Sequence, residues 1–387
     1  MSDNVTPIRP QGSLRKRVVQ ITLAVCLAVL ILAVVVVAVK NHLTDFGAVR
    51  RYFTYRNAMS SESFGTYHYD AHNGSRFQAY DEGLAVGTVG GLELLDDYGV
   101  KALEVRATMS TPSVQTNGEK ILCYDVGGRE LILAHETQGK LLELDTKAPI
   151  LDANLSSGGA FCYISSEGSY KAVIPVYNSH QEQVYAWYSA TAYFTQCAVS
   201  PDADTLAAVS IGEEEAAFQS VLQFFDTKSE EPAATVQLGD QLVYELSFLS
   251  GSVVCVWGEN GLFFYRTDGK ELGSYEPEGQ IVTADFHGNG YVAVWLESNL
   301  AGAQETVCTF DTNGSVIATL EPDGKLLDLS VRGKYVSILS STGLLIADER
   351  LHRYADTEQT GAATRVRQRA DGSAILLTST DGSLYLP

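Results

Sequence analysis

The chain has 387 residues, of which 45% are hydrophobic, enough apolar material to bury a sizeable core. It carries 47 Asp and Glu against 27 Lys and Arg, a formal net charge of −20 at pH 7. Because proteins bind nucleic acid by neutralising phosphates with Lys and Arg, this balance argues against a nucleic-acid partner. The acidity is typical of a surface that keeps a protein soluble, and an acidic face that attracts cations or a basic partner is the alternative.

The first element along the chain is an apolar run. Residues 18–39, from Val18 to Val39, have only Gln20 and Thr22 as polar interruptions. A helix rises 1.5 Å per residue, so a run of this length crosses the roughly 30 Å hydrocarbon core of a bilayer. It is longer than the apolar part of a cleaved signal peptide and ends without a clear cleavage site. The sequence therefore predicts an uncleaved transmembrane signal anchor.

The charges beside this run indicate its direction. Arg15, Lys16 and Arg17 lie directly before it, and the basic bias favours a cytoplasmic N-terminus. We therefore expect the rest of the chain outside the cytoplasm, tied to the cell membrane by a single pass. The expected cytoplasmic tail, transmembrane anchor, juxtamembrane stalk and main domain are residues 1–17, 18–39, 40–61 and 62–387.

From about residue 62 the sequence consists of short runs rich in Val, Leu, Ile, Tyr and Phe, separated by turn signals. Asx-Gly pairs suit hairpin turns because both residues tolerate positive φ. No long segment has apolar residues at helical spacing, so the domain is predicted to be all-β. The Asx-Gly turns begin at Asn73, Asn117, Asp268, Asn289, Asn313, Asp323, Asp371 and Asp381.

The runs also recur at a longer period of about 40 residues, the length of a four-stranded propeller blade. The last unit has three strands, and residues 64–69 form an unassigned alternating strand before the first unit. We predict a β-propeller of eight four-stranded blades, with seven as the alternative, in which residues 64–69 complete the last blade and close the ring. The units begin near Ser75, Thr111, Pro149, Ala192, Gln241, Gln280, Lys325 and Ala362.

One of these units carries a recognisable motif. Residues 194–209 resemble the "SPDG…LA" strand–turn–strand of WD-repeat-like and quinoprotein-like bacterial propellers, with Ala203 where that motif usually has Gly. Together with the N-terminal anchor, residues 171–190 resemble an uncharacterised single-anchor propeller family, a domain of unknown function found mainly in clostridia-like Gram-positive bacteria. The resemblance implies a fold and a location, and no motif in it is catalytic.

The cysteines are spread along the chain. None forms a CxxC pair, and those of the main domain fall in different units. We expect them to be small buried residues in strands, neither a disulfide framework nor a zinc site. The six are Cys26 in the apolar run, then Cys123, Cys162, Cys197, Cys255 and Cys308.

Other residues that could carry chemistry have a simpler structural interpretation. His68 and His72 are the closest histidine pair, but a Tyr/His-rich edge strand explains them better than a metal site. Asp202 and Asp204 lack the remaining ligands of a Ca²⁺ loop and fit a hairpin turn. The tryptophans would stack a sugar or a quinone if they shared one face, although packing between blades is the favoured interpretation. They are Trp187, Trp257 and Trp295.

No hydrolase elbow, metalloprotease helix or phosphate loop occurs in the sequence, so we assign no catalytic, cofactor-binding or metal-binding residue. The sequence predicts a non-catalytic, membrane-anchored, extracytoplasmic scaffold that binds a protein or an envelope polymer on a propeller face. A quinoprotein-like or other propeller enzyme with a site in the central funnel is the alternative. Fold analogy alone connects the ring to binding.

Overall fold

The computed structural model describes residues 21–23, 55, 64–69, 74–81, 83–214, 217–298 and 305–387. The chain divides into two compact units, Met1–Arg56 and Asn57–Pro387. Within the described residues, no helix is both long and apolar enough to cross a membrane. The predicted anchor at residues 18–39 lies outside them except for residues 21–23, and so does the predicted stalk except for Tyr55.

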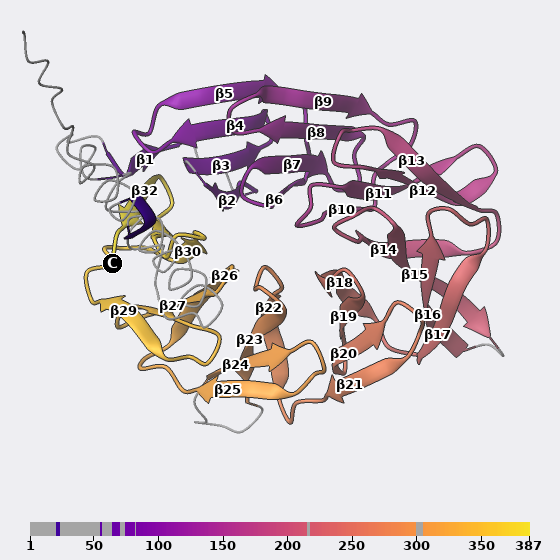
Figure 1. Ribbon diagram of the computed structural model, residues 1–387. Coiled ribbons are helices and arrows are strands. Elements are labelled where there is room, and N and C mark those ends of the chain that lie inside the picture. The colour runs from indigo at the N-terminus through magenta and orange to yellow at the C-terminus, as the bar shows by residue number, and fades with distance from the viewer. Residues whose placement is uncertain are drawn as a thin grey trace, which may run out of the picture. The chain divides into compact units, whose positions relative to one another are not determined.

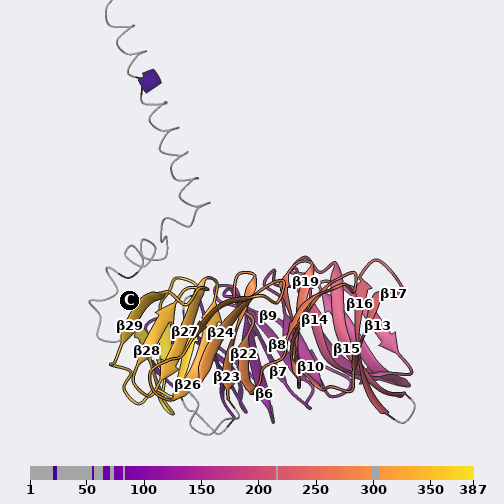
Figure 2. The same cartoon turned by 90° about the horizontal axis from the view of Figure 1, so that it is seen from below.

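The second unit is a β-propeller. Its described strands form eight antiparallel sheets of four strands each, arranged as blades of a ring (Figure 1). In the view turned by 90° about the horizontal axis, the blades lie side by side around the ring (Figure 2). The prediction of an all-β domain with eight blades is confirmed, and the seven-bladed alternative is wrong.

In blades 1 to 7 the strands follow chain order from the innermost to the outermost position. Blade 1 has β2 (Arg76–Tyr80), β3 (Gly83–Thr88), β4 (Gly91–Asp96) and β5 (Lys101–Arg106), and blade 2 has β6 (Pro112–Thr116), β7 (Lys120–Asp125), β8 (Glu130–His135) and β9 (Gly139–Asp145). Blade 3 has β10 (Asp152–Leu155), β11 (Phe161–Glu167), β12 (Tyr170–Tyr177) and β13 (Gln183–Ser189), and blade 4 has β14 (Tyr193–Val199), β15 (Thr205–Glu214), β16 (Ala217–Asp226) and β17 (Pro232–Gly239).

Blade 5 has β18 (Val243–Ser250), β19 (Val253–Gly258), β20 (Gly261–Arg266) and β21 (Glu271–Tyr275), and blade 6 has β22 (Gln280–Asp285), β23 (Tyr291–Glu297), β24 (Thr306–Asp311) and β25 (Val316–Leu320). Blade 7 has β26 (Leu326–Arg332), β27 (Tyr335–Ser340), β28 (Leu344–Ala347) and β29 (Arg353–Thr357). Blade 8 has β30 (Arg365–Gln368), β31 (Ala374–Leu377), β32 (Asp381–Tyr385) and, as its outermost strand, β1 (Thr66–His68).

Strand β1 closes the ring. It pairs antiparallel with β32, with Tyr67 opposite Gly382 and His68 opposite Asp381. The Tyr67 side chain is completely buried, which fixes the register because a slip by one residue would turn it to solvent. The predicted closure by residues 64–69 is therefore confirmed, and it joins the two ends of the domain within one blade.

The core lies between the blades. Eight clusters of buried side chains are present among the described residues, one at each interface between neighbouring blades. A middle strand contacts both adjacent blades, so β27 is buried along its whole length, whereas the outer strand β9 has no fully buried residue. This explains the nearly continuous apolar runs in the sequence, since such strands have no solvent-facing side.

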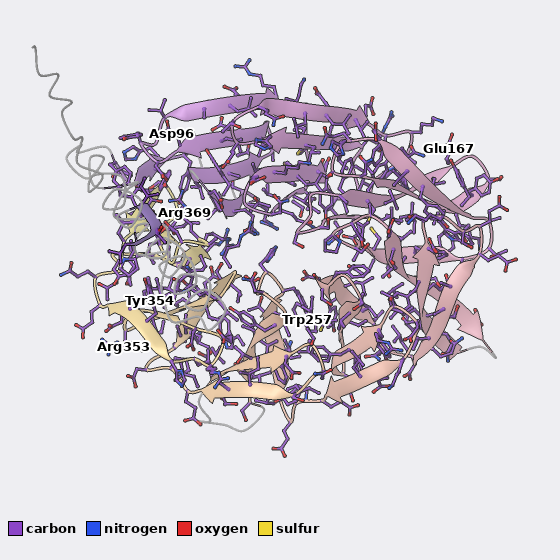
Figure 3. The ribbon with its side chains drawn as sticks, in the orientation of Figure 1. Asp96, Glu167, Trp257, Arg353, Tyr354 and Arg369 are labelled. Carbon is purple, nitrogen blue, oxygen red and sulfur yellow. The ribbon has the colours of Figure 1, made fainter. Side chains whose placement is uncertain are left out.

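The predictions that the tryptophans pack between blades and that Asp202 belongs to a hairpin turn are confirmed. Trp187, Trp257 and Trp295 pack against the clusters between blades 3 and 4, 5 and 6, and 6 and 7, respectively. Figure 3 labels Trp257 within the ring of blades. Asp202 accepts hydrogen bonds from the Ser200 hydroxyl (2.5 Å) and the Asp204 backbone N–H (3.2 Å), as in a hairpin turn.

The turn within the propeller motif of residues 194–209 contains an unusual residue, Ala203. Ala203 adopts a φ of 63°, the left-handed region that favours glycine, and its side chain is buried against the cluster between blades 3 and 4. A positive φ costs free energy for alanine, and at Ala203 the methyl group offsets part of this cost by packing into the core. This is the physical meaning of the Ala-for-Gly difference in the motif.

Candidate functional site

The innermost strands surround a cavity of about 970 Å³ along the ring axis. Each of the eight contributes at least one polar side chain to its wall, although the two faces of every blade are apolar. The polar lining comprises Gln78 of β2, Gln115 of β6, Asp152 and Asn154 of β10, Gln196 of β14, Glu245 of β18, Asp285 of β22, Asp328 of β26 and Arg367 of β30.

Many of these side chains link one blade to the next. The innermost strand of a sheet has one unpaired edge, so its backbone N–H and C=O groups need other partners. The Gln115 side chain provides such partners for two backbone groups of blade 3. Its Nε2 donates to the Ala153 carbonyl, and its Oε1 accepts from the Leu155 N–H, each at 2.8 Å. Asp152 of blade 3 in turn accepts the Cys197 N–H of blade 4 at 2.9 Å.

The same device recurs across the ring. Asp285 accepts the Val331 N–H and Asp328 accepts the Val366 N–H, both at 2.8 Å, which joins blade 6 to blade 7 and blade 7 to blade 8. Arg367 then pairs with Asp328 at 2.7 Å and donates to the carbonyl of residue 77 in blade 1 at 2.8 Å. These channel residues are therefore structural as well as accessible.

Glu245 is the exception. In the part of the chain that the structure describes, its carboxyl group has no hydrogen-bond partner, and it opens to the channel. Burial, reinforced by the charges of Asp285 and Asp152, raises the pKa of Glu245 to about 8. Burial likewise raises the pKa of Asp152 to about 6, against hydrogen bonds from Cys197 and Ala153 that lower it. A cation or a hydrogen-bond donor entering the channel would offset this unfavourable environment.

Asp285 has compensation that Glu245 lacks. Burial acts to raise the pKa of Asp285, but the charge and hydrogen bonds of His287, together with the Val331 N–H, hold it below its ordinary value. The His287 Nδ1 lies 2.7 Å from an Asp285 oxygen. The acidic groups of the channel are thus unequal, and the uncompensated one is Glu245.

An arginine crosses the channel at the end where the innermost strands finish. Arg332, the last residue of β26 in blade 7, donates from Nη1 to the Thr116 carbonyl of blade 2 at 2.7 Å. Its Nη2 is buried without a hydrogen-bond partner among the described residues. Burial lowers the pKa of Arg332, and the nearby Asp81 and Asp285 carboxylates oppose that effect.

The opposite face of the ring, where the innermost strands begin, has a different character; we call it the entry face. Because all blades have the same strand order around the ring, their innermost strands begin on this one face. Large apolar side chains that are 36–53% exposed occur here in successive blades, and we call them the apolar rim. The rim consists of Val126, Leu151, Tyr193, Leu242, Tyr244, Val282 and Leu327.

The rim adjoins the channel. Val126, Leu151 and Tyr244 also line the cavity, and Asp152 and Glu245 follow Leu151 and Tyr244 directly in the chain. The rim extends over blades 2 to 7, whereas blades 8 and 1 begin with the exposed Arg365 and Arg76. Contiguous exposed apolar side chains bordered by charge are typical of protein interaction surfaces.

The residues considered from sequence do not assemble here. His68 lies on the outermost strand of blade 8, where its Nδ1 contacts Asp381 at 2.6 Å, and His72 is outside the described residues. No group of three or more potential metal ligands occurs in the described ranges. The three tryptophans pack between blades and do not line the channel, whose aromatic residues are Tyr124, Tyr244, Phe248 and Phe286.

Sequence reasoning missed the channel residues. A signal was present: an Asp, Glu or Gln stands in the first strand of most repeat units, where apolar alternation alone would suffice for a strand. That signal does not distinguish residues that bond to the next blade, such as Asp328, from one that does not, such as Glu245.

Comparisons with known proteins support the fold. A family model described as "Family of unknown function (DUF5711)" matches residues 51–378. No curated protein matches the sequence. Among solved structures, the chain is similar to the C-terminal WD40 domain of Sif2 (TM-score 0.54, 15% identity, covering 79% of this chain and 93% of that one).

Two further structures are similar at the same level. BamB from Moraxella catarrhalis has a TM-score of 0.52 and 14% identity over 82% of this chain and 97% of its own. Chaetomium thermophilum Sqt1, bound to the N-terminus of ribosomal protein L10, has a TM-score of 0.55 and 14% identity over 84% of this chain and 100% of its own. At these identities the similarity shows the propeller fold.

Proposed function

We propose a function from the surface of this chain itself, because the chain belongs to DUF5711, a family of unknown function. The protein is a non-catalytic, membrane-anchored scaffold outside the cytoplasm, and it binds a protein partner on the entry face. One observation carries the proposal: the apolar rim borders the channel mouth over blades 2 to 7, and the carboxyl group of Glu245 in this channel has no hydrogen-bond partner among the described residues. The rim provides apolar area to bury, and the carboxyl provides a specific polar contact.

The same observation indicates the chemistry of the partner. Binding at the rim would be strengthened by a segment that places a Lys or Arg side chain into the channel and apolar side chains against Leu242 and Tyr244. A cation beside Glu245 and Asp152 would favour their ionised forms and bind with charge-assisted hydrogen bonds. The net charge of −20 would also attract a basic partner over longer distances.

The anchor and the fold are consistent with this role. Residues 18–39 have the length and composition of a single membrane span, and the basic residues before them favour an external propeller. The similar Sqt1 structure holds the N-terminus of another protein, which illustrates that a propeller of this kind can bind a polypeptide segment. The rim also has five aliphatic side chains, which favour a protein partner because an envelope polymer would be bound by hydrogen bonds and aromatic stacking.

Photo-crosslinking in intact cells tests the proposal. A photoreactive residue is placed at position 151 or 244 on the rim, or at Val316 on the outer strand β25, which is also 50% exposed. We expect a discrete crosslinked protein from the rim positions and none from position 316. Glu245→Gln should reduce that crosslink. Equal products from all three positions, or crosslinks to glycan alone, would contradict a protein-binding rim.

A further inference from the structure

Two cysteines from different blades are in contact. The Cys162 Sγ of β11 in blade 3 lies 3.5 Å from the Cys197 Sγ of β14 in blade 4. Both side chains belong to the cluster that fills the interface between these blades, and both are buried. They stand in separate repeat units of the sequence, and it is the packing of one blade against the next that makes them neighbours.

The two thiols are both buried, but they differ in their position relative to the channel. Cys197 lines the central cavity, whereas Cys162 is not part of the cavity wall. The Cys197 backbone N–H is fixed by Asp152 at 2.9 Å, so the strand that carries this thiol is held in place at the channel. A small molecule that enters the channel therefore reaches the strand that carries Cys197 before it reaches Cys162.

We propose that Cys162 and Cys197 form an interblade disulfide by exchange with a low-molecular-weight disulfide that enters through the channel. The Cys197 sulfur attacks one sulfur of the reagent, which gives a mixed disulfide and releases one reagent thiol. The Cys162 sulfur then attacks the Cys197 sulfur, which forms the protein disulfide and releases the second thiol. Both protons leave on the released thiols, the two cysteines are oxidised by two electrons, and the reagent disulfide is reduced.

The geometry requires a modest movement. A disulfide bond is about 2.05 Å long, so the sulfurs must approach by about 1.5 Å from their present contact. Burial raises the pKa of Cys197 well above its ordinary value, which slows the exchange because the thiolate is the reactive form. The pair is thus slow to oxidise, and an oxidising space outside the cytoplasm would favour the bonded form.

The remaining propeller thiols provide controls. Cys255 is buried in blade 5 with no second thiol in contact among the described residues. Cys123 has Met109 as its sulfur neighbour, at 3.7 Å, and Cys308 contacts the Thr319 hydroxyl at 3.5 Å. None of these three lines the cavity, so they differ from Cys197 in position as well as in partner.

The test uses the full chain in detergent, incubated with oxidised glutathione, alkylated, digested and analysed by mass spectrometry. The wild type should yield the crosslinked peptides of Cys162 and Cys197 and fall from six free thiols to four. Cys162→Ala should stop at a glutathione adduct on Cys197, and Cys197→Ala should give neither adduct nor crosslink. Cys255→Ala should oxidise as the wild type does. The oxidised wild type should melt about 5 °C higher, because the bond restricts the unfolded chain.

Three results would overturn the inference. If the wild type accumulates the Cys197 adduct without the crosslink, the blades cannot bring the sulfurs together. If Cys197→Ala acquires an adduct on Cys162, the channel is not the route of attack. If the wild type keeps all six thiols at saturating oxidised glutathione, the exchange does not take place. The wild-type peptide map decides the first point without depending on the folding of any variant.

Discussion

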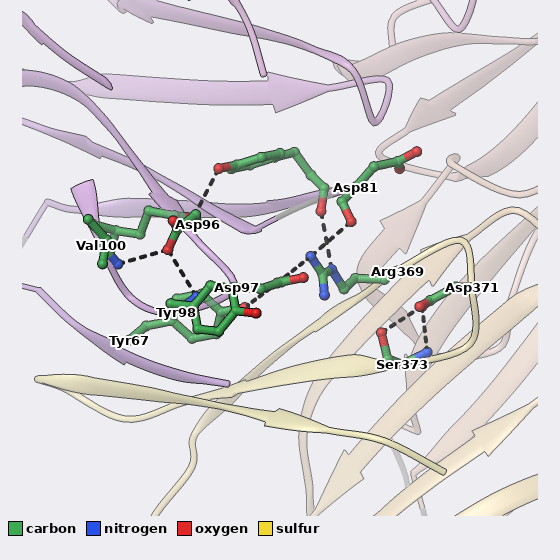
Figure 4. A network of polar contacts seen from close by, with 11 residues as sticks. Tyr67, Asp81, Asp96, Asp97, Tyr98, Val100, Arg369, Asp371 and Ser373 are labelled. Carbon is green, nitrogen blue, oxygen red and sulfur yellow. Dashed lines mark hydrogen bonds and ion pairs between the residues drawn. The ribbon is translucent and has the colours of Figure 1, made fainter. Parts of the chain in front are cut away.

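Arg369 of blade 8 and Asp97 of blade 1 form a buried ion pair across the seam of the ring. The Nη2–Oδ1 distance is 2.8 Å, and the two side chains are 2% and 14% exposed. The Tyr67 hydroxyl of β1 donates to the same Asp97 oxygen at 2.9 Å, and Arg369 also donates to the Asp81 carbonyl (Figure 4). This one carboxylate therefore connects the strand that closes the ring with the first and last blades.

We expect Arg369→Met to destabilise the propeller by about 3–5 kcal/mol, since it leaves Asp97 buried without its cation. Urea unfolding followed by tryptophan fluorescence measures the loss. Arg353→Met is the matched control, because Arg353 pairs with Asp356 on the outside of the ring with both side chains well exposed. It should cost at most about 0.5 kcal/mol. Equal losses in the two variants would show that the seam pair is not special.

The linking role of the channel glutamine can be tested in the same way. Gln115→Ala leaves the Leu155 N–H and the Ala153 carbonyl of blade 3 without their partner, so we expect a loss of about 1–3 kcal/mol. Gln196 also lines the channel, but its side chain has no hydrogen bond within the described ranges. Gln196→Ala should therefore be nearly neutral. A neutral Gln115→Ala would argue against the interblade linkage.

Glu245 should make stability depend on pH. The pKa of Glu245 is about 8 in the folded protein and lower in the unfolded chain. At a pH between these two values, the folded protein therefore binds a proton that the unfolded chain has released. Wild-type stability therefore falls as the pH rises from about 4.5 through 8, since the folded protein must then hold the buried charge. Glu245→Gln removes this penalty and should be more stable than the wild type at pH 9, by roughly 2 kcal/mol.

The difference between Glu245→Gln and the wild type should nearly vanish at pH 5, where the wild-type carboxyl is protonated in the fold. Urea unfolding of both proteins at pH 5, 7 and 9 measures it, and Glu259→Gln, at an exposed turn, serves as the control. A difference that is constant with pH would show that Glu245 does not titrate in this window. Asp152, with a pKa of about 6, adds a smaller decline at lower pH in both proteins.

The membrane orientation is a prediction from sequence alone. Protease added to cells without their wall should digest the propeller and leave a tag at the N-terminus intact, because Arg15 to Arg17 favour a cytoplasmic tail. A cytoplasmic marker protein must survive the same treatment. A protected propeller with a digested tag would reverse the orientation, and release of the intact chain into the medium would contradict the anchor.

The sequence by itself determined the all-β class and the strand that closes the ring, and it favoured eight blades over seven. The physical reason is that pairing within a blade is local: an alternating run, an Asx-Gly turn and the next run specify each other over about ten residues. Closure was also predictable, because the last unit was short by one strand and residues 64–69 supplied one. The five propeller cysteines were correctly expected to be buried in strands, and the tryptophans to pack between blades.

Only the tertiary structure decided which residues meet across blades. Cys162 and Cys197 are 35 positions apart and Asp97 and Arg369 are 272 apart, and no local pattern connects either pair. Their contacts depend on how far each blade is rotated about the ring axis, which is set by the summed packing of eight apolar interfaces. The channel follows the same rule: Glu245 has no hydrogen-bond partner among the described residues because its neighbours on adjacent blades, and not its own strand, determine what its carboxyl group can reach.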